Sequence, residues 1–142
     1  MSENIVTELA SGVLRIEMRR PEKKNALTGP MYAAMADALE RAAREDAVRV
    51  VLIHGQPEVF TAGNDLEDFL KESTSNTDLP RGASNAVKFL YSLAHNVKPI
   101  IAAVNGVAIG IGTTMLFHCD YVLASKTATF STPFIHLGLV PE

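Results

Sequence analysis

The sequence has little of several features that would place it in a special class. Its 142 residues include one cysteine, Cys119, and no tryptophan. A single cysteine excludes an internal disulfide and favours a reducing compartment. The net charge of −3 gives no indication of non-specific binding to nucleic acid. The four histidines lack the spacing of metal ligands, so we expect no bound metal.

The sequence also shows neither the pattern of a signal peptide nor that of a good membrane span. Residues 1–12 lack a basic region followed by an apolar core, so we expect no signal peptide and a cytoplasmic protein, with an organelle as the alternative. Residues 99–117 carry no charge, but one asparagine, three glycines and two threonines make this segment a poor membrane span. With 47% hydrophobic and 20% charged residues, the composition is that of one ordinary globular domain.

The first half of the chain alternates the patterns of strands and helices, which predicts an α/β fold. Residues 5–9 and 13–18 alternate apolar and polar side chains around a Ser-Gly turn, which predicts a β-hairpin. Pro30 stands at the start of a predicted helix. The apolar stripe of that helix is Met31, Met35, Ala38, Leu39, Ala42 and Ala43. Residues 50–53 are continuously apolar, as in a strand that is covered on both faces.

A basic cluster lies between the hairpin and this helix. Its members are Arg19, Arg20, Lys23 and Lys24. Such a cluster is usually a solvated loop, and the alternative is a surface that meets phosphate groups.

Two later segments turn at glycine into a predicted helix. Residues 60–66, FTAGNDL, pass through Gly63 to Asn64 and Asp65, which suit the N-terminus of a short helix. Residues 100–114 begin as a buried strand and then turn through three glycines into a helical pattern. Free N–H groups at two such turns can form an oxyanion hole, which stabilises an enolate or a tetrahedral oxyanion. The alternative is a buried crossover in which the glycines only relieve crowding.

The remaining segments add a loop, a helix and two strands. Residues 72–80 are polar and predict a mobile loop, which is either plain surface or a flap over a site. Residues 81–95 predict a second amphipathic helix. Residues 121–124 and 128–132 predict short strands, and the chain is then almost wholly apolar up to Glu142.

Four segments in register resemble the crotonase (enoyl-CoA hydratase/isomerase) superfamily. They are RPEKKNAL, FTAGNDL, KPIIAAVNGVAIGIG and ATFSTPFIHLGLVPE, and the resemblance covers essentially all 142 residues. It is closest to the peroxisomal-type 3,2-enoyl-CoA isomerases. It implies an α/β, ClpP-like spiral of strand-strand-helix units, of which residues 1–142 would be the N-terminal core with the C-terminal helical part missing. It also implies an acyl-CoA thioester as substrate, no separate cofactor, a homotrimer or hexamer, and neither nucleic acid nor membrane as a partner.

The resemblance also implies a set of site residues. The oxyanion donors would be the backbone N–H groups of Asn64 and Ile111, which follow Gly63 and Gly110. The residues that would bind the substrate and its CoA moiety are Lys24, Ala26, Ala62, Asp65, Leu66, Gly110, Thr114 and Phe134.

The catalytic carboxylates distinguish the reactions of the family. Hydratases that resemble this chain use two glutamates, at the positions of Thr114 and Phe134, and neither is a glutamate here. Glu142, in LGLVPE, matches the single catalytic glutamate of the isomerases. One carboxylate can move a proton from the α carbon to the γ carbon, and apolar neighbours raise its pKa toward a useful range.

The sequence therefore predicts an isomerase of fatty-acid oxidation that shifts a 3-enoyl-CoA double bond to the 2-position. One alternative is another crotonase-type enzyme, either a hydratase (a lyase) or a thioester hydrolase. Another is a non-catalytic acyl-CoA-binding or assembly module. Because the resembled enzymes continue for nearly as many residues again, we expect residues 1–142 to be truncated and poorly active alone.

Overall fold

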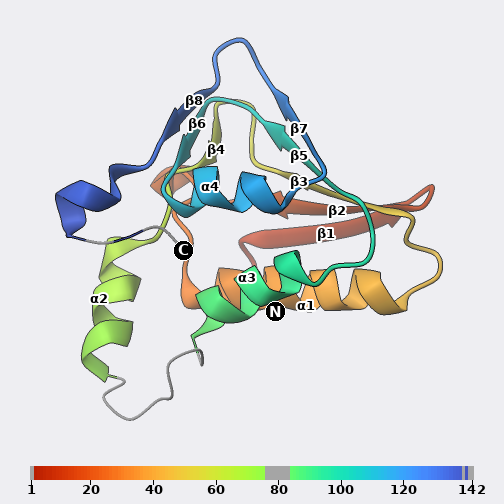
Figure 1. Cartoon of the computed structure of the whole chain (residues 1–142), viewed down its shortest axis with the longest axis horizontal. Helices are drawn as coiled ribbons and strands as arrows, with labels where there is room; N and C mark the ends of the chain where they lie inside the picture. Colours follow the sequence, from red (N-terminus) through yellow and green to blue (C-terminus); the bar gives the residue numbers. More distant parts are fainter. Residues whose placement is uncertain (1, 76–83, 139, 141–142) are drawn as a thin grey trace.

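Two β-sheets organise the chain (Figure 1). The computed structural model describes residues 2–75, 84–138 and 140. A five-stranded sheet has the order β1-β2-β3-β5-β7, and its strands are β1 (Ile5–Ala10), β2 (Val13–Met18), β3 (Val50–His54), β5 (Ile100–Val104) and β7 (Tyr121–Ala124). A three-stranded sheet has the order β4-β6-β8, and its strands are β4 (Val59–Thr61), β6 (Val107–Ile109) and β8 (Thr129–Ser131).

Three consecutive strand pairs are divided between the two sheets in the same way. The first strand of each pair joins the large sheet, and the second joins the small one. All pairings among β3, β5 and β7, and among β4, β6 and β8, are parallel. A helix follows each unit, so the predicted α/β arrangement of strand-strand-helix units is confirmed. The carboxyl ends of β4, β6 and β8 therefore meet at one edge of the small sheet.

The helices lie on different sides of this frame. α1 (Gly29–Arg44) and α3 (Asn85–Ala94) pack against each other beside the large sheet, whereas α2 (Leu66–Ser75) stands at the far side of the small one (Figure 1). α4 (Ile111–Thr114) continues as the 3₁₀ turn η2 (Met115–His118). Two further 3₁₀ turns are η1 (Pro21–Lys23) and η3 (Pro133–Leu137).

The main core lies between the large sheet and α1 with α3. Most of the predicted stripe of α1 is buried, with Met31 and Met35 wholly inaccessible, although Ala43 is exposed. Phe60 and Phe89 are the largest fully buried side chains. A buried side chain of this size contributes about 1.5–3 kcal/mol, and the buried methionines Met31 and Met35 fix α1 to the core in the same way.

Several sequence expectations need correction. Residues 106–114 hold a separate strand, β6, before the glycine turn, so the strand that leads into α4 is β6 and not β5. The expected loop 72–80 begins later, because α2 continues to Ser75; its remainder lies outside the described residues. The expected helix 81–95 begins at Asn85, with the Ser84 side chain accepting the Val87 N–H as the N-cap.

The hairpin and the other strands agree with the sequence. β1 and β2 pair antiparallel around Ser11 and Gly12, both of which have positive φ. β3, β5, β7 and β8 lie where strands were expected. Residues 99–117 form two strands and short helical turns, and no described helix has the length and apolar character needed to cross a membrane.

Candidate functional site

Two strand-turn-helix units lie side by side. β4 leads through Gly63 into α2, and β6 leads through Gly110 into α4. Parallel pairing of Val59 with Val107 and of Thr61 with Ala108 makes the two strands neighbours. The turns touch, since a Cβ on Gly63 would lie 2.8 Å from the Ile109 carbonyl oxygen. The structure thus brings together two turns that are separate in the sequence.

In the first turn, backbone hydrogen bonds fix the direction of the Asn64 N–H. The Gly63 carbonyl accepts the Leu27 N–H at 2.7 Å, and the Asp65 N–H donates to the Leu27 carbonyl at 2.8 Å. In a trans peptide the carbonyl and the following N–H point in opposite directions. The Asn64 N–H therefore points away from Leu27.

The same argument applies to the Ile111 N–H in the second turn. The Gly110 carbonyl accepts the N–H groups of Thr113 at 2.9 Å and Thr114 at 3.0 Å, so it points into α4. The Ile111 N–H consequently points out of the start of that helix. Gly110 has φ +58, a conformation that glycine adopts readily, and its own N–H is held by the Ser131 carbonyl at 2.8 Å.

Both turns line one cavity of about 710 Å³. The lining residues are Lys23, Ala26, Ala62, Gly63, Asn64, Asp65, Leu66, Glu67, Leu70, Ile109, Gly110, Ile111, Pro133 and Phe134. This size fits a drug-sized or cofactor-sized ligand. Apolar side chains dominate the wall, with backbone polar groups concentrated at the two turns.

Most of the sequence-assigned site residues meet in this cavity. Of the expected positions that the structure describes, Lys24 and Thr114 stand outside the lining. Lys24 instead holds the first turn, because its carbonyl accepts the Ala62 N–H at 2.9 Å, and Lys23 lines the cavity in its place. Thr114 is buried within α4. Glu142 lies outside the described residues.

An ion pair braces the first turn. Arg20 Nη1 lies 2.7 Å from Asp65 Oδ2, and the two side chains are only 16% and 13% exposed. Arg20 Nη1 also donates to the Ala26 carbonyl at 2.9 Å. The hydrogen bond from Arg20 holds the pKa of Asp65 below its ordinary value. Asp65 is therefore ionised at neutral pH, and Arg20 is committed to it rather than free to meet a phosphate.

The ionised Asp65 also caps α2. Its Oδ1 accepts the N–H groups of Glu67 and Asp68, both at 3.1 Å, as expected for an aspartate at a helix N-terminus. Arg19, the neighbour of Arg20, pairs with Glu17 at 2.7 Å. Two members of the basic cluster are thus engaged within the chain.

Tyr32, on α1, also contacts the first turn. Its hydroxyl is hydrogen-bonded to Asn64 Oδ1, and its ring packs 5.7 Å from that of Phe89. This contact could not be predicted from the sequence, because Tyr32 belongs to the buried side of an amphipathic helix and has the pattern of a core residue.

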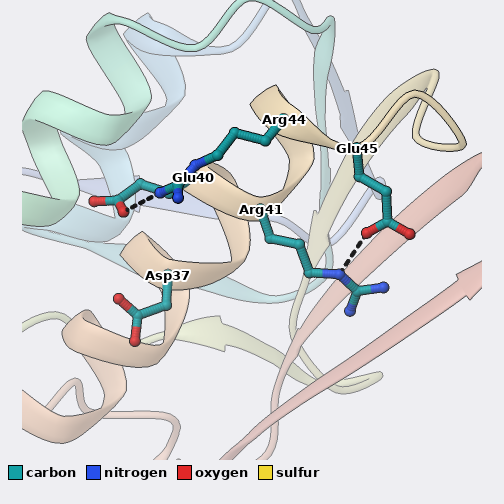
Figure 2. A pocket seen from close by; sticks show the side chains of 5 residues that line it. All are labelled: Asp37, Glu40, Arg41, Arg44 and Glu45. Atoms are coloured by element: carbon teal, nitrogen blue, oxygen red, sulfur yellow. Dashed lines mark hydrogen bonds and ion pairs between the residues drawn. The ribbon is translucent and has the colours of Figure 1, made fainter.

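A second hollow, of about 530 Å³, lies on the outer face of α1 and has a different character (Figure 2). Its lining residues are Asp37, Glu40, Arg41, Arg44 and Glu45. Arg41 pairs with Glu45 at 2.6 Å, and Arg44 pairs with Glu40 at 2.9 Å. Asp37 pairs with Lys88, outside the lining, at 2.9 Å. Because each of these charges has an ion-pair partner, this hollow offers a ligand no converging unpaired group. We assign the candidate site to the cavity at the two turns.

The single cysteine offers no nucleophile. Burial raises the pKa of the Cys119 thiol to about 11, so the thiol stays protonated at neutral pH. In the described part of the chain, no three His, Cys, Asp or Glu residues come together in a way that could hold a metal ion.

Comparison with known proteins places the chain in one family. The family described as enoyl-CoA hydratase/isomerase matches residues 8–142. The human protein named enoyl-CoA delta isomerase 2 is 40% identical, over 99% of this chain and 36% of its own length. The Escherichia coli protein named 1,2-epoxyphenylacetyl-CoA isomerase is 34% identical, over the whole of this chain and 55% of its own length.

Solved structures show the same relationship. An enoyl-CoA hydratase/carnithine racemase homologue from Magnetospirillum magneticum has a TM-score of 0.91 and 47% identity, covering 100% of this chain and 54% of its own. An enoyl-CoA hydratase/isomerase homologue from Acinetobacter baumannii has a TM-score of 0.95 and 44% identity, covering 100% of this chain and 57% of its own. The chain thus spans about half the length of these relatives, or less. On sequence, fold and paired turns together, the chain belongs to the enoyl-CoA hydratase/isomerase (crotonase) family.

Proposed function

We propose that the protein is an acyl-CoA isomerase that moves a 3-enoyl-CoA double bond to the 2-position. The observation that carries this proposal is the pair of backbone N–H groups, of Asn64 and Ile111, in turns that line one cavity. The oxygen of a thioester gains negative charge when its α proton leaves. Two fixed donors stabilise that charge, and one donor of this kind contributes about 3–4 kcal/mol in the transition state.

The proton has to be carried along the acyl chain. A base removes the α proton, the negative charge spreads over a dienolate, and the same base returns the proton at the γ carbon. We assign this role to Glu142 from its motif. The cavity wall includes apolar side chains, among them Phe134 and Leu66, and a carboxylate that enters such a cavity has its pKa raised toward neutral.

The residues at the two hydratase-type positions support isomerisation over hydration. Phe134 lines the cavity, and its ring can neither donate nor accept the protons of a water molecule. Thr114 is buried, and a hydroxyl has no useful basicity at neutral pH. The human and rat relatives named as delta isomerases, at 40% and 38% identity, support the same choice.

The CoA moiety and the assembly state complete the proposal. We expect the CoA moiety to lie along the first turn, where Lys23, Ala26 and Ala62 form one side of the cavity. We expect a homotrimer or a pair of trimers, which analytical ultracentrifugation of the natural protein would measure.

A direct test compares 3-hexenoyl-CoA with 2-hexenoyl-CoA as substrates of the protein as its gene encodes it. We expect isomerisation of the 3-enoyl thioester and little hydration of the 2-enoyl thioester. Glu142→Gln should lower kcat by about a hundredfold to ten-thousandfold, the usual contribution of a general base, with unchanged binding of saturated hexanoyl-CoA. Glu3→Gln, at an exposed site, is the matched control.

The other outcomes identify the other functions. Efficient hydration without isomerisation would make the protein a hydratase, and release of free CoA would make it a thioester hydrolase. Hexanoyl-CoA binding with no turnover, unaffected by Glu142→Gln, would make it a binding module.

A further inference from the structure

The residue of the first proposed donor has a polar side chain that is hydrogen-bonded, whereas the residue of the second, Ile111, has an apolar side chain. Asn64 carries an amide whose Oδ1 accepts a hydrogen bond from the Tyr32 hydroxyl. We propose that Tyr32 is a positioning residue, which holds Asn64 so that its backbone N–H faces the thioester oxygen. The inference rests on the proposed oxyanion role of Asn64.

Tyr32 is suited to this task because it is rigid. The residue is 4% exposed and lies in the first half of α1, among the core residues of that helix. Its ring packs against Phe89 of α3, with 5.7 Å between the ring centroids. A tyrosine has only two side-chain torsions, and packing on both helices fixes the position of its hydroxyl.

The start of α1 is tied to the same turn by a second contact. The Gly29 N–H donates to Asp68 Oδ2 at 2.6 Å, which joins the first turn of α1 to the first turn of α2. Residues on both sides of Asn64 are also held, since Gly63 and Asp65 bond to the backbone of Leu27.

These contacts restrict different movements. The bonds to Leu27 set the direction of the peptide groups on either side of residue 64. The Tyr32 hydroxyl holds the side chain of the same residue, so it limits the residual rotation of residue 64 that these bonds still allow. Rotation of that kind would swing the N–H away from a bound oxygen. A positioned donor loses stabilising power steeply when its angle to the acceptor worsens.

The principal test is Tyr32→Phe in the protein as its gene encodes it, with 3-hexenoyl-CoA as substrate. The ring and its packing remain, and only the hydroxyl is lost. We expect kcat to fall about threefold to tenfold, the range that corresponds to one ordinary hydrogen bond. KM should stay nearly unchanged, and the thermal midpoint should fall by no more than a few degrees. Tyr91→Phe, at an exposed tyrosine of α3, is the matched control and should leave kcat unchanged.

A spectroscopic measurement reports on the donor itself. Hexanoyl-CoA labelled with ¹³C at the thioester carbonyl should show a lowered C=O stretching frequency when it is bound, because the donors polarise the bond. Tyr32→Phe should reduce this shift at saturating ligand. A purely structural role for the hydroxyl would lower stability or affinity and leave the shift of the bound ligand intact, and that result would overturn the inference.

A double-mutant comparison shows whether Tyr32 acts through Asn64. Asn64→Ala keeps the backbone N–H and removes the accepting oxygen, and it should reproduce the reduced carbonyl shift. In that background Tyr32→Phe should change nothing further, whereas an equal additional loss would overturn the inference. If Tyr32→Phe does not fold, Asn64→Ala alone decides, since an unchanged shift in it contradicts the proposal.

Failure of the proposed function would look different. Wild-type protein that binds hexanoyl-CoA without any carbonyl shift would refute the oxyanion role itself. A wild-type shift that persists in Tyr32→Phe would refute only the role of Tyr32.

Discussion

The two turns present similar donors but are held by different forces. The Gly63 turn has backbone hydrogen bonds to Leu27 and, in addition, several side-chain contacts: the Arg20–Asp65 ion pair, the Tyr32 contact, and Thr61 Oγ1, which accepts the Gly63 N–H at 3.1 Å. The Gly110 turn is held mainly by its own backbone, through the carbonyl of Gly110 and the N–H bond to Ser131.

The difference has a chemical consequence. The first turn contains a charged pair that is mostly removed from water, so its geometry responds to pH and to single side-chain changes. Among the residues that the structure describes, those that brace the second turn include no ionisable group, so pH and salt have little effect on these contacts. Two proposed donors of the same kind can therefore differ in how strongly pH and salt affect the turns that hold them.

The largest expected effect comes from filling the contact between the turns. Gly63 has φ +91, and a Cβ there would lie 2.8 Å from the Ile109 carbonyl oxygen. Gly63→Ala should lower the free energy of unfolding by about 3 kcal/mol through backbone strain and this clash. Gly110→Ala is the matched control: its φ is also positive, but a Cβ there meets nothing within 4 Å. It should cost only about 1–2 kcal/mol, measured by urea unfolding. Equal losses would show that the turns do not press together.

The next effect tests the ion pair. Asp65→Asn retains a residue that can cap α2 but removes the charge that faces Arg20. We expect a loss of about 2 kcal/mol in unfolding free energy at pH 7. Because folding lowers the pKa of Asp65 from its ordinary 3.8, the pair stabilises the wild type above that pH, and the stabilisation is lost as pH falls through the folded-state pKa.

The measurement is therefore the difference in unfolding free energy between wild type and Asp65→Asn as a function of pH. It should be constant from pH 7 to about 5 and should shrink below about 4. A difference that is independent of pH down to pH 2 would contradict the ionic account of the first turn.

A smaller effect is expected in the second turn. Thr113 Oγ1 lies 2.7 Å from the Ala108 carbonyl and 3.2 Å from that of Ser131, and it donates to these acceptors. Thr113→Val removes these bonds with little change of volume, and it should cost about 1 kcal/mol. The loss should be the same at pH 4 and pH 7 and at low and high salt, in thermal or urea unfolding. A loss of unfolding free energy that depends strongly on pH would contradict the proposed difference between the two turns.

The smallest effect is expected at the exposed ion pairs of α1. Arg41 and Glu45 lie 2.6 Å apart, but their side chains are 48% and 35% exposed. Glu45→Gln should change the unfolding free energy by at most about 0.5 kcal/mol, and 1 M salt should abolish the change. A cost comparable to that of Asp65→Asn would show that burial is not what strengthens the Arg20 pair.

The sequence predicts much of this fold because most elements carry a clear period or run of apolar residues. The sequence does not predict β4 and β6, because each is a three-residue strand that leads directly into a glycine turn, and the turn signal dominates these segments. β6 also follows β5 after a two-residue turn, so the two strands resemble one strand that leads into a helix.

The site was predicted less from pattern than from resemblance. The motifs assigned Asn64 and Ile111 as donors, but only the pairing of β4 with β6 brings their turns together. Arg20 and Asp65 are 45 residues apart, so the pattern of charges along the sequence does not predict that they pair. Tyr32 has the spacing of a core residue, and its hydroxyl contact depends on how α1 sits against the turn.

The parallel pairing of β4 and β6 sets the distance between the two turns that follow these strands. Neighbouring strands lie about 4.8 Å apart, a spacing that main-chain hydrogen bonds impose whatever the side chains are. The sheet therefore determines the separation of the two proposed donors, and side-chain substitutions change that separation little. The side chains that face the donors are under no such restraint. If the two N–H groups hold the thioester oxygen as proposed, a related protein with the same sheet can carry a different acid or base, and hence catalyse a different reaction, without a change in these two groups.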